Sequence, residues 1–394
     1  MQATSPFSFG QVVNDENFTD RIVERKSIFN NLSSGNSTIL ISPRRYGKSS
    51  LVATVLDQFA KKKAYAVTSL DLTASRSETA FLENFATQLL QANASKTSKW
   101  LNTLAQKLKH IIPTISFGLG GPHDKVSLTF NWSEKKKTSQ EILQLPQMLA
   151  QVSGRKQVIA IDEFQNLVRF DPDGALQYEM RAYWQHQTDV SYCLYGSKRH
   201  MMEEIFVDTS APFYNFGQIL RLGKIPEKYW TPFISRKFSE TDKPIPEKYA
   251  LQISKSMQLH SEYIQFLSHL IWSECAKGPI QSAHMVRGLG KFMNSTSIHF
   301  VDLYDKISNH QVNVLKTVIN QETHLTSQET LKKYKLGTSA NALKARKALV
   351  KEDFLMKTKE GYNFINPAFE LWFRKEVMGE DIINRWTKLL QDLS

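Results

Sequence analysis

The sequence predicts an α/β fold with a parallel β-sheet core, a helical segment after it and a small basic unit at the C-terminus. Up to about residue 235, short apolar segments alternate with amphipathic helical ones, as in the β-α-β crossovers of a parallel sheet. Strand signals then stop, and residues 247–300 show the apolar spacing of helices. Residues 305–394 combine helical segments, a short hairpin and an excess of Lys and Arg.

Each element of the core has its own signal. The predicted strands are apolar runs at 37–41, 64–72, 157–161, 191–195 and 219–222. Helical spacing between them predicts helices that include 51–59, 81–91 and 101–111. Alternating apolar residues on both sides of the turn cluster Gly120–Asp124 predict a β-hairpin inserted at about 113–133.

Composition narrows the class of protein. With 50 basic and 38 acidic residues the formal charge is +12, which favours polyanionic partners such as nucleotides or nucleic acid. The two cysteines, Cys193 and Cys275, have no metal-ligand spacing and form no disulfide framework, so we expect a reducing cytoplasm. No apolar run approaches 18 residues, and we expect no membrane span and no membrane partner.

A phosphate-binding loop follows the first strand. The pattern G-x-x-x-x-G-K-[ST] is matched at 42–49 except for its first glycine, which is Ser42. We expect Ser42 to be tolerated because it is small. The predicted nucleotide-binding residues are Ser42, Pro43, Arg44, Arg45, Tyr46, Gly47, Lys48, Ser49 and Ser50.

The loop's chemistry follows from its place between a strand and a helix. Backbone N–H groups of the loop and of the helix N-terminus form a nest for phosphate oxygens. We expect Gly47 to allow close approach of the backbone, Lys48 to reach the β- and γ-phosphates, and the Ser49 hydroxyl to ligate Mg²⁺.

The strand at 157–161 ends in two carboxylates, Asp162 and Glu163. Ligands bind at the carboxyl edge of such sheets, so Asp162 is a candidate for holding Mg²⁺ and Glu163 for orienting or deprotonating an attacking water. The alternative is an ordinary strand followed by an acidic helix N-terminus. The presence of the phosphate-binding loop in the same chain favours the metal and water roles over this alternative. The adjacent Glu favours hydrolysis over transfer to a small molecule.

Together these motifs are similar to the archaeal-type P-loop ATPases, a branch of the STAND/AAA+ ATPases. The resemblance rests on ISPRRYGKSSL (41–51), IDEFQNL (161–167), LYGSKRHMMEEIF (194–206) and FINPAFELWFRK (364–375). Residues 18–24 also resemble the family's N-terminal box F-x-x-R-x-x-E, which approaches the nucleotide base.

The resemblance implies ATP and ADP as ligands, with a P-loop ATPase core, a helical lid and a winged-helix domain. We place these at 1–235, 236–304 and 305–394. It also implies a phosphate-sensing residue after the fourth strand, where Ser197 stands. Many relatives carry Gly-Arg where this chain has Asn215-Phe216, which puts an arginine finger from that position in doubt.

The departures from the family pattern lead to two further expectations. Arg199 and Arg221 are candidate substitutes for the missing finger. The segment 259–265 resembles the family's lid helix start without its Gly and Pro, and we expect His260 there to be structural rather than a ligand.

The C-terminal unit fits a winged helix. Thr326–Glu329 predicts a capping box, Thr338 or Ser339 caps a third helix that runs to about residue 351, and 354–365 forms the wing. From 331 to 359 there are nine basic and two acidic residues, a net charge of nine minus two, +7. Lys344, Lys347 and Lys351 share one helix face, which predicts contact with phosphates of double-stranded DNA, and Asn341 and Arg346 are the candidates for reading bases.

Two functional hypotheses follow. The first is an Mg²⁺-dependent ATPase in which Lys48, Glu163 and Ser197 act in catalysis, Ser49 and Asp162 hold the metal, and nucleotide state controls a DNA-binding winged helix. The second is a nucleotide-gated interaction module with negligible turnover, which uses the winged helix for protein contacts. Another protein or a second copy of the chain is the expected partner. The Phe216 position favours the second.

Overall fold

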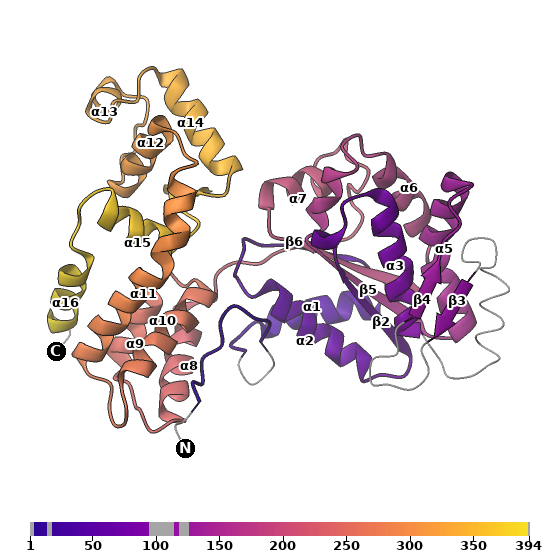
Figure 1. Ribbon diagram of the computed structural model, residues 1–394, viewed down its shortest axis with the longest axis horizontal. Helices are drawn as coiled ribbons and strands as arrows, with labels where there is room; N and C mark the ends of the chain where they lie inside the picture. The colour runs from indigo at the N-terminus through magenta and orange to yellow at the C-terminus, as the bar shows by residue number, and fades with distance from the viewer. Residues whose placement is uncertain (1–3, 14–17, 94–113, 118–125, 393–394) are drawn as a thin grey trace. The chain divides into compact units, whose positions relative to one another are not determined.

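A computed structural model describes residues 4–13, 18–93, 114–117 and 126–392 (Figure 1). The chain forms two compact units, which are described separately. The first spans Arg21–Gly223, and the second joins residues 1–20 to 224–394. The boundary that we predicted at residue 235 differs from this division, and the finer split into core, lid and winged helix stays a prediction.

The first unit contains the predicted parallel sheet. Its strand order is β2-β5-β6-β1-β7, and every neighbouring pair is parallel. Strand β1 and all seven residues of β6 are buried, because they lie inside a sheet that is covered on both faces. The strands are β1 (Thr38–Ile41), β2 (Tyr65–Asp71), β5 (Lys156–Asp162), β6 (Val190–Gly196) and β7 (Gln218–Arg221).

Helices cover both faces of this sheet. In Figure 1, α1 and α2 lie on one side of it and α3, α5 and α6 on the other. Ile39 and Ile41 of β1 belong to the core that packs against α3, α5 and α6. The helices of the unit are α1 (Ile22–Ser33), α2 (Lys48–Ala60), α3 (Glu78–Asn93), α5 (Lys135–Ser153), α6 (Ala175–Trp184) and α7 (Arg199–Phe206), with short 3₁₀ turns η2 (Leu72–Ala74) and η3 (Phe164–Arg169).

The inserted hairpin is confirmed. Strands β3 (Thr114–Phe117) and β4 (Val126–Thr129) pair antiparallel, with Thr114 opposite Thr129. The turn cluster at 120–124 and the helix predicted at 101–111 lie outside the described residues.

The second unit is mainly helical. Its apolar core runs through all of its helices and includes Phe7 from the N-terminal segment, whose ring lies 4.9 Å from that of Phe238. The elements after residue 224 are α8 (Glu227–Ser239), α9 (Glu247–Ser256), α10 (Ser261–Glu274), α11 (Ser282–Tyr304), α12 (Asn309–Ile319), α13 (Gln328–Lys333), α14 (Ser339–Lys351), β8 (Leu355–Thr358), β9 (Gly361–Phe364), α15 (Pro367–Glu376) and α16 (Ile382–Asp392).

Helices α12–α14 and the β8–β9 hairpin form the expected winged helix, with one correction. The cap of α13 is Ser327, whose Oγ accepts a hydrogen bond from the Thr330 N–H at 3.2 Å. The predicted box placed the cap one residue earlier, at Thr326, and its reciprocal Glu329 contact is not formed. Thr338 caps α14 by accepting from the Asn341 N–H at 3.2 Å.

Helices α10 and α11 approach closely at Gly288. A Cβ atom there would lie 2.5 Å from Ile271 Cγ1 and 2.9 Å from Ile271 Cα. Gly288→Ala is therefore expected to lower the free energy of unfolding by about 1–3 kcal/mol through overpacking, less the roughly 1 kcal/mol that Ala gains over Gly in a helix. Urea unfolding followed by circular dichroism measures the change.

Gly290, on the same helix, is the matched control. A Cβ atom at Gly290 would meet nothing within 4 Å, so Gly290→Ala is expected to leave stability unchanged or raise it by up to about 1 kcal/mol. Equal effects of the two substitutions would contradict the close approach.

None of the helices among the described residues is long and apolar enough to span a membrane.

Candidate functional site

The phosphate-binding loop lies between β1 and α2, as predicted. Gly47 has φ 83° and precedes the first helical residue, Lys48. A Cβ atom at Gly47 would meet nothing within 4 Å, so glycine is needed here for its left-handed backbone and not for space. Ser42 is buried, and its Oγ donates to the Pro43 carbonyl at 2.8 Å; its φ is not positive, so serine fits at this position without strain.

The first turn of α2 leaves N–H groups without helical partners. The loop joins the end of β1 directly to this turn. A helix start that follows a tight loop is a general anion-binding arrangement, and residues 42–50 have this geometry.

Lys48 is the centre of the charged cluster. Its side chain is only 6% exposed, and its Nζ lies 2.9 Å from Asp162 Oδ1 and 3.5 Å from Glu163 Oε1. It also lies 5.0 Å from the centre of the Tyr195 ring on β6. The motif after β1 and the carboxylates after β5 are 114 residues apart in sequence, and the sheet brings them together.

Ser49 and Asp162 bring two potential metal-ligand oxygens together. Its Oγ donates to Asp162 Oδ2 at 3.0 Å, so a hydroxyl and a carboxylate oxygen adjoin at the carboxyl edge of the sheet. Mg²⁺ is bound in proteins by one or two such oxygens, together with waters and substrate phosphates. The donor set of Ser49 and Asp162 therefore fits this ion.

Glu163 occupies a constrained position at the end of β5. Its backbone is left-handed, with φ 50°, and its N–H donates to Asp162 Oδ1 at 2.7 Å. Its Oε2 accepts hydrogen bonds from Ser197 Oγ at 2.8 Å and from Gln165 Nε2. Burial raises the pKa of Glu163, but Lys48 and these hydrogen bonds outweigh it and hold the pKa below the usual value, so the carboxylate is ionised at neutral pH.

Ser197 lies directly after β6, where the sequence placed it. Besides contacting Glu163, its Oγ accepts a hydrogen bond from Arg44 Nε at 3.4 Å. The structure thus brings together the predicted residues Arg44, Lys48, Glu163 and Ser197 from three loops. From its position directly after the Asp-Glu pair, Gln165 is expected to couple the phosphate state to the rest of the domain, and the structure adds its contact with Glu163.

The N-terminal box also contacts the phosphate-binding loop. Arg21 is 2% exposed, and its Nη2 donates to the carbonyl oxygens of Tyr46 at 3.3 Å and Gly223 at 2.6 Å. Its Nη1 pairs with Glu24 at 3.0 Å. Burial raises the pKa of Tyr46 to about 12, despite the opposing Arg21 charge. The Arg and Glu of the box therefore contact each other and brace the loop backbone.

Phe216, at the position where many relatives carry the arginine finger, belongs to an aromatic cluster. The Phe216 ring lies 5.1 Å from Phe213 and 6.2 Å from Trp184, and the Arg181 guanidinium lies 5.2 Å above it. The candidate substitutes, Arg199 and Arg221, both pair with Glu203 Oε1, at 3.2 and 3.4 Å.

The surroundings of His260 fit the structural role that is expected of it. It is buried directly before α10, and its ring lies 4.6 Å from that of Tyr263.

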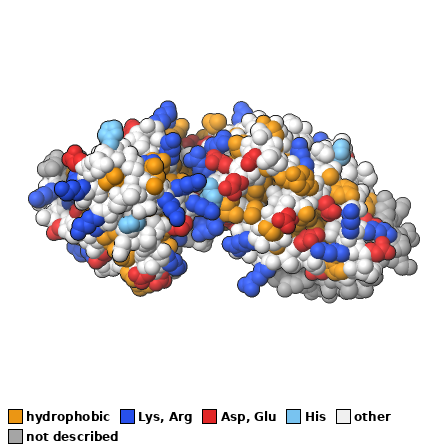
Figure 2. Space-filling model, turned by 90° about the horizontal axis from the view of Figure 1, so that it is seen from above, with side chains coloured by type: hydrophobic (Ala, Val, Ile, Leu, Met, Phe, Trp, Pro, Cys, Tyr) orange, Lys and Arg blue, Asp and Glu red, His pale blue; other side chains and the backbone are white. Residues whose placement is uncertain are grey.

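The third helix of the winged helix presents an exposed basic face. Lys344, Lys347 and Lys351 are all exposed on α14. Arg346, a candidate for base contact, lies 4.5 Å over the Tyr362 ring of the wing. Figure 2 shows Lys and Arg side chains spread over the part of the second unit that holds α13 and α14.

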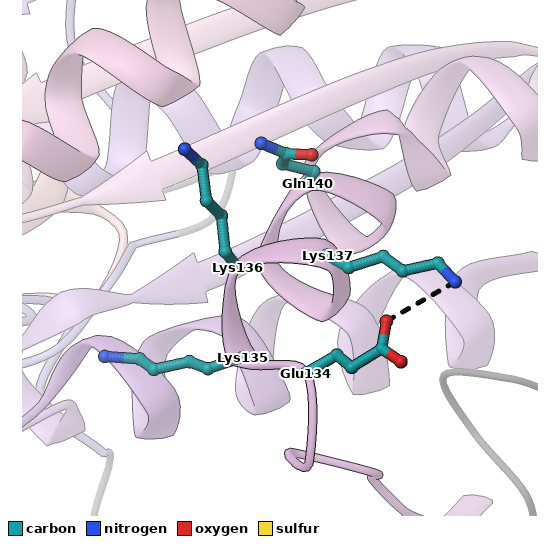
Figure 3. A pocket seen from close by; sticks show the side chains of 5 residues that line it. All are labelled: Glu134, Lys135, Lys136, Lys137 and Gln140. Atoms are coloured by element: carbon teal, nitrogen blue, oxygen red, sulfur yellow. Dashed lines mark ion pairs between the residues drawn. The ribbon is translucent and has the colours of Figure 1, made fainter.

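A shallow hollow of about 410 Å³ lies at the first turn of α5 (Figure 3). Its charges are largely neutralised, because Lys135 pairs with Glu78 at 2.7 Å and Lys137 with Glu134 at 3.5 Å. Lys136 and Gln140 complete its lining, and no residue of the predicted nucleotide site belongs to it.

Comparison with known proteins agrees with this architecture. A family model described as a probable winged helix domain matches residues 298–375, whereas no curated protein matches the sequence significantly. A Walker-type ATPase of Pyrococcus abyssi superposes with a TM-score of 0.67 at 15% identity, over 94% of this chain and 99% of that one.

The ORC2 protein of Aeropyrum pernix, solved in ADPNP–ADP complexes, superposes with a TM-score of 0.55 at 9% identity, over 98% of this chain and 99% of that one. At such identities the likeness concerns the fold, and the resemblance to archaeal P-loop ATPases is confirmed at that level. The chain therefore has the fold of the Walker-type P-loop ATPases and carries a C-terminal winged-helix domain.

Proposed function

We propose that this protein is an Mg²⁺-dependent ATPase whose nucleotide state controls its winged-helix domain. The observation that supports this most strongly is the cluster of Lys48, Ser49, Asp162, Glu163 and Ser197 at the carboxyl edge of the sheet. The two cysteines of the protein are buried free thiols. This supports the reducing cytoplasm as the compartment of the protein.

Each side chain has a role that follows from its surroundings. The loop N–H groups and Lys48 bind the phosphates of ATP, and Ser49 and Asp162 hold the metal. Mg²⁺ would supply positive charge against the phosphate oxygens. Glu163, ionised at neutral pH, accepts a proton from the water that attacks the γ-phosphorus as the bond to the ADP oxygen breaks. Ser197 senses the γ-phosphate through its hydroxyl in this proposal.

Phosphate release from ATP, measured with Mg²⁺ in the presence and absence of duplex DNA, tests this function. Turnover that depends on Mg²⁺ and rises with DNA is the expected result. Tight ATP binding without turnover in either condition would contradict hydrolysis.

The basic face of α14 supports a role in binding duplex DNA. Replacing Lys344, Lys347 and Lys351 by Gln is expected to weaken DNA binding roughly tenfold or more at low salt, because each contact with a phosphate releases counterions. The slope of log K against log salt should become shallower by about 0.9 for each lysine that contacts a phosphate. Fluorescence anisotropy over a salt series measures both quantities.

A triple substitution elsewhere in the same unit controls for total charge. Lys228, Lys255 and Lys277 are exposed outside the winged helix, and replacing them by Gln removes the same three charges. We expect the slope to stay unchanged in this control. An equal loss in both triple variants would show that net charge, and not the α14 face, determines binding.

The aromatic cluster around Phe216 favours a second candidate function, the nucleotide-gated interaction module with negligible turnover. Phe216 packs against Trp184, and Arg199 and Arg221 both pair with Glu203. Neither position 216 nor these two arginines then provides a catalytic arginine, so turnover by the chain alone is expected to be negligible. A dependence of oligomeric state on ATP, measured by light scattering, would support this alternative.

A further inference from the structure

The two oxygens of the Glu163 carboxylate face different groups. Oε2 accepts hydrogen bonds from Ser197 Oγ at 2.8 Å, from Ser197 N–H at 3.4 Å and from Gln165 Nε2. Oε1 faces the Lys48 ammonium at 3.5 Å. One oxygen is therefore held by the protein interior, and the other is directed toward the phosphate-binding loop.

Gln165 makes its contact at a cost to its own hydrogen bonding. It is 1% exposed, and because a carboxylate oxygen only accepts, the amide Nε2 must face Glu163. Its Oε1 is then buried without a hydrogen-bond partner among the described residues, which costs about 1–3 kcal/mol. A charge-assisted hydrogen bond to Glu163 offsets that cost, so the contact to the carboxylate explains why an amide is buried here.

The absence of a side chain at Gly196 leaves space for the Gln165 amide. A Cβ atom at Gly196 would overlap Gln165 Oε1 and would lie 2.6 Å from Met202 Sδ. The left-handed backbone of Glu163, at φ 50°, turns the chain sharply from β5 into η3, so that Gln165 reaches back to the residue two positions before it. Such a conformation costs a non-glycine residue about 1–3 kcal/mol and concentrates at functional sites.

From these contacts we infer that Gln165 is a positioning residue, which fixes Oε2 of Glu163 together with Ser197 so that Oε1 is the oxygen that receives the proton of the attacking water. This role rests on the proposed ATP hydrolysis. Gln165 touches neither the phosphates nor the water, and it acts only through the orientation of Glu163.

The test compares Gln165→Met with the unchanged protein in ATP hydrolysis and in ATP binding. Met fills a similar volume without a donor. We expect kcat to fall about 10- to 100-fold, as for a misplaced catalytic group, while the ATP dissociation constant stays within about twofold. In a Glu163→Gln background, Gln165→Met should have no further effect on kcat, because the two residues act as a unit. An unchanged kcat, or additive losses in the double variant, would overturn the inference.

Gln177→Leu is the matched control. Gln177 is also buried, and its Nε2 donates to a carboxylate, Asp171 Oδ2, at 3.2 Å, but neither residue belongs to the site. We expect it to leave kcat unchanged. If the Met variant does not fold, Gln165→Asn keeps the amide but is too short to reach Glu163, and the same loss is expected.

Crystal structures with a non-hydrolysable ATP analogue separate this inference from the proposed function. We expect a single Glu163 orientation in the unchanged protein and a displaced or doubled one in Gln165→Met. This readout needs no turnover, so a protein that fails to hydrolyse ATP refutes the ATPase proposal alone. An identical Glu163 position in both structures refutes the role of Gln165.

Discussion

Lys48→Ala is expected to abolish tight ATP binding. The Lys48 ammonium is nearly fully buried and pairs with both Asp162 and Glu163. Its removal takes away the cation that is proposed to reach the phosphates and leaves two carboxylates facing the polyanion. Removing one partner of a charged pair between protein and ligand typically costs about 2–5 kcal/mol of binding free energy, which corresponds to a loss of roughly 30-fold or more in affinity. Isothermal titration calorimetry with ATP and Mg²⁺ measures the loss.

Lys61→Ala is the control for this prediction. Lys61 is exposed at the C-terminal end of the same helix, α2, so its charge should matter little for the nucleotide. ATP affinity within about threefold of the unchanged protein in Lys48→Ala would contradict the placement of the phosphates at this loop.

Glu163→Gln is expected to leave ATP binding intact and to remove turnover. The amide keeps the shape of the side chain, and its oxygen can still accept from Ser197, but it does not take a proton from water. General-base catalysis typically contributes about 10²- to 10⁴-fold, and the loss in kcat should fall in that range. Steady-state phosphate release measures turnover, and calorimetry on the same sample measures binding.

Glu78→Gln serves as its control, because Glu78 pairs with Lys135 on the surface of the same unit. Normal hydrolysis by Glu163→Gln would show that another group takes the proton. A matching loss in Glu78→Gln would indicate a general effect on the fold.

The sequence predicted the parts of the site that lie in continuous patterns. The loop at 42–50 and the apolar run before Asp162 are local signals, and their strand and helix flanks follow from apolar spacing. Ser197 was located through the family resemblance, and the structure places it 2.8 Å from Glu163.

Other features depend on tertiary structure that the local pattern does not contain. The position of β6 between β5 and β1 is set by packing of the whole sheet. Gln165 becomes part of the site only because Gly196, 31 positions later, leaves space for its amide. Arg346 remains a candidate for contacting bases, but its position over the Tyr362 ring depends on where the wing folds.

The order of the two units along the chain has a consequence for how they can be separated. Since residues 1–20 belong with 224–394, the parallel-sheet unit is inserted into the sequence of the helical unit. A winged-helix fragment that starts at residue 224 loses Phe7 from its core and the hydrogen bond between Ser5 and His269. The parallel-sheet unit, by contrast, has its first and last residues close together, because the Arg21 guanidinium donates to the Gly223 carbonyl at 2.6 Å. If residues 21–223 are excised and a short linker closes the gap, the helical unit therefore keeps all of its core residues.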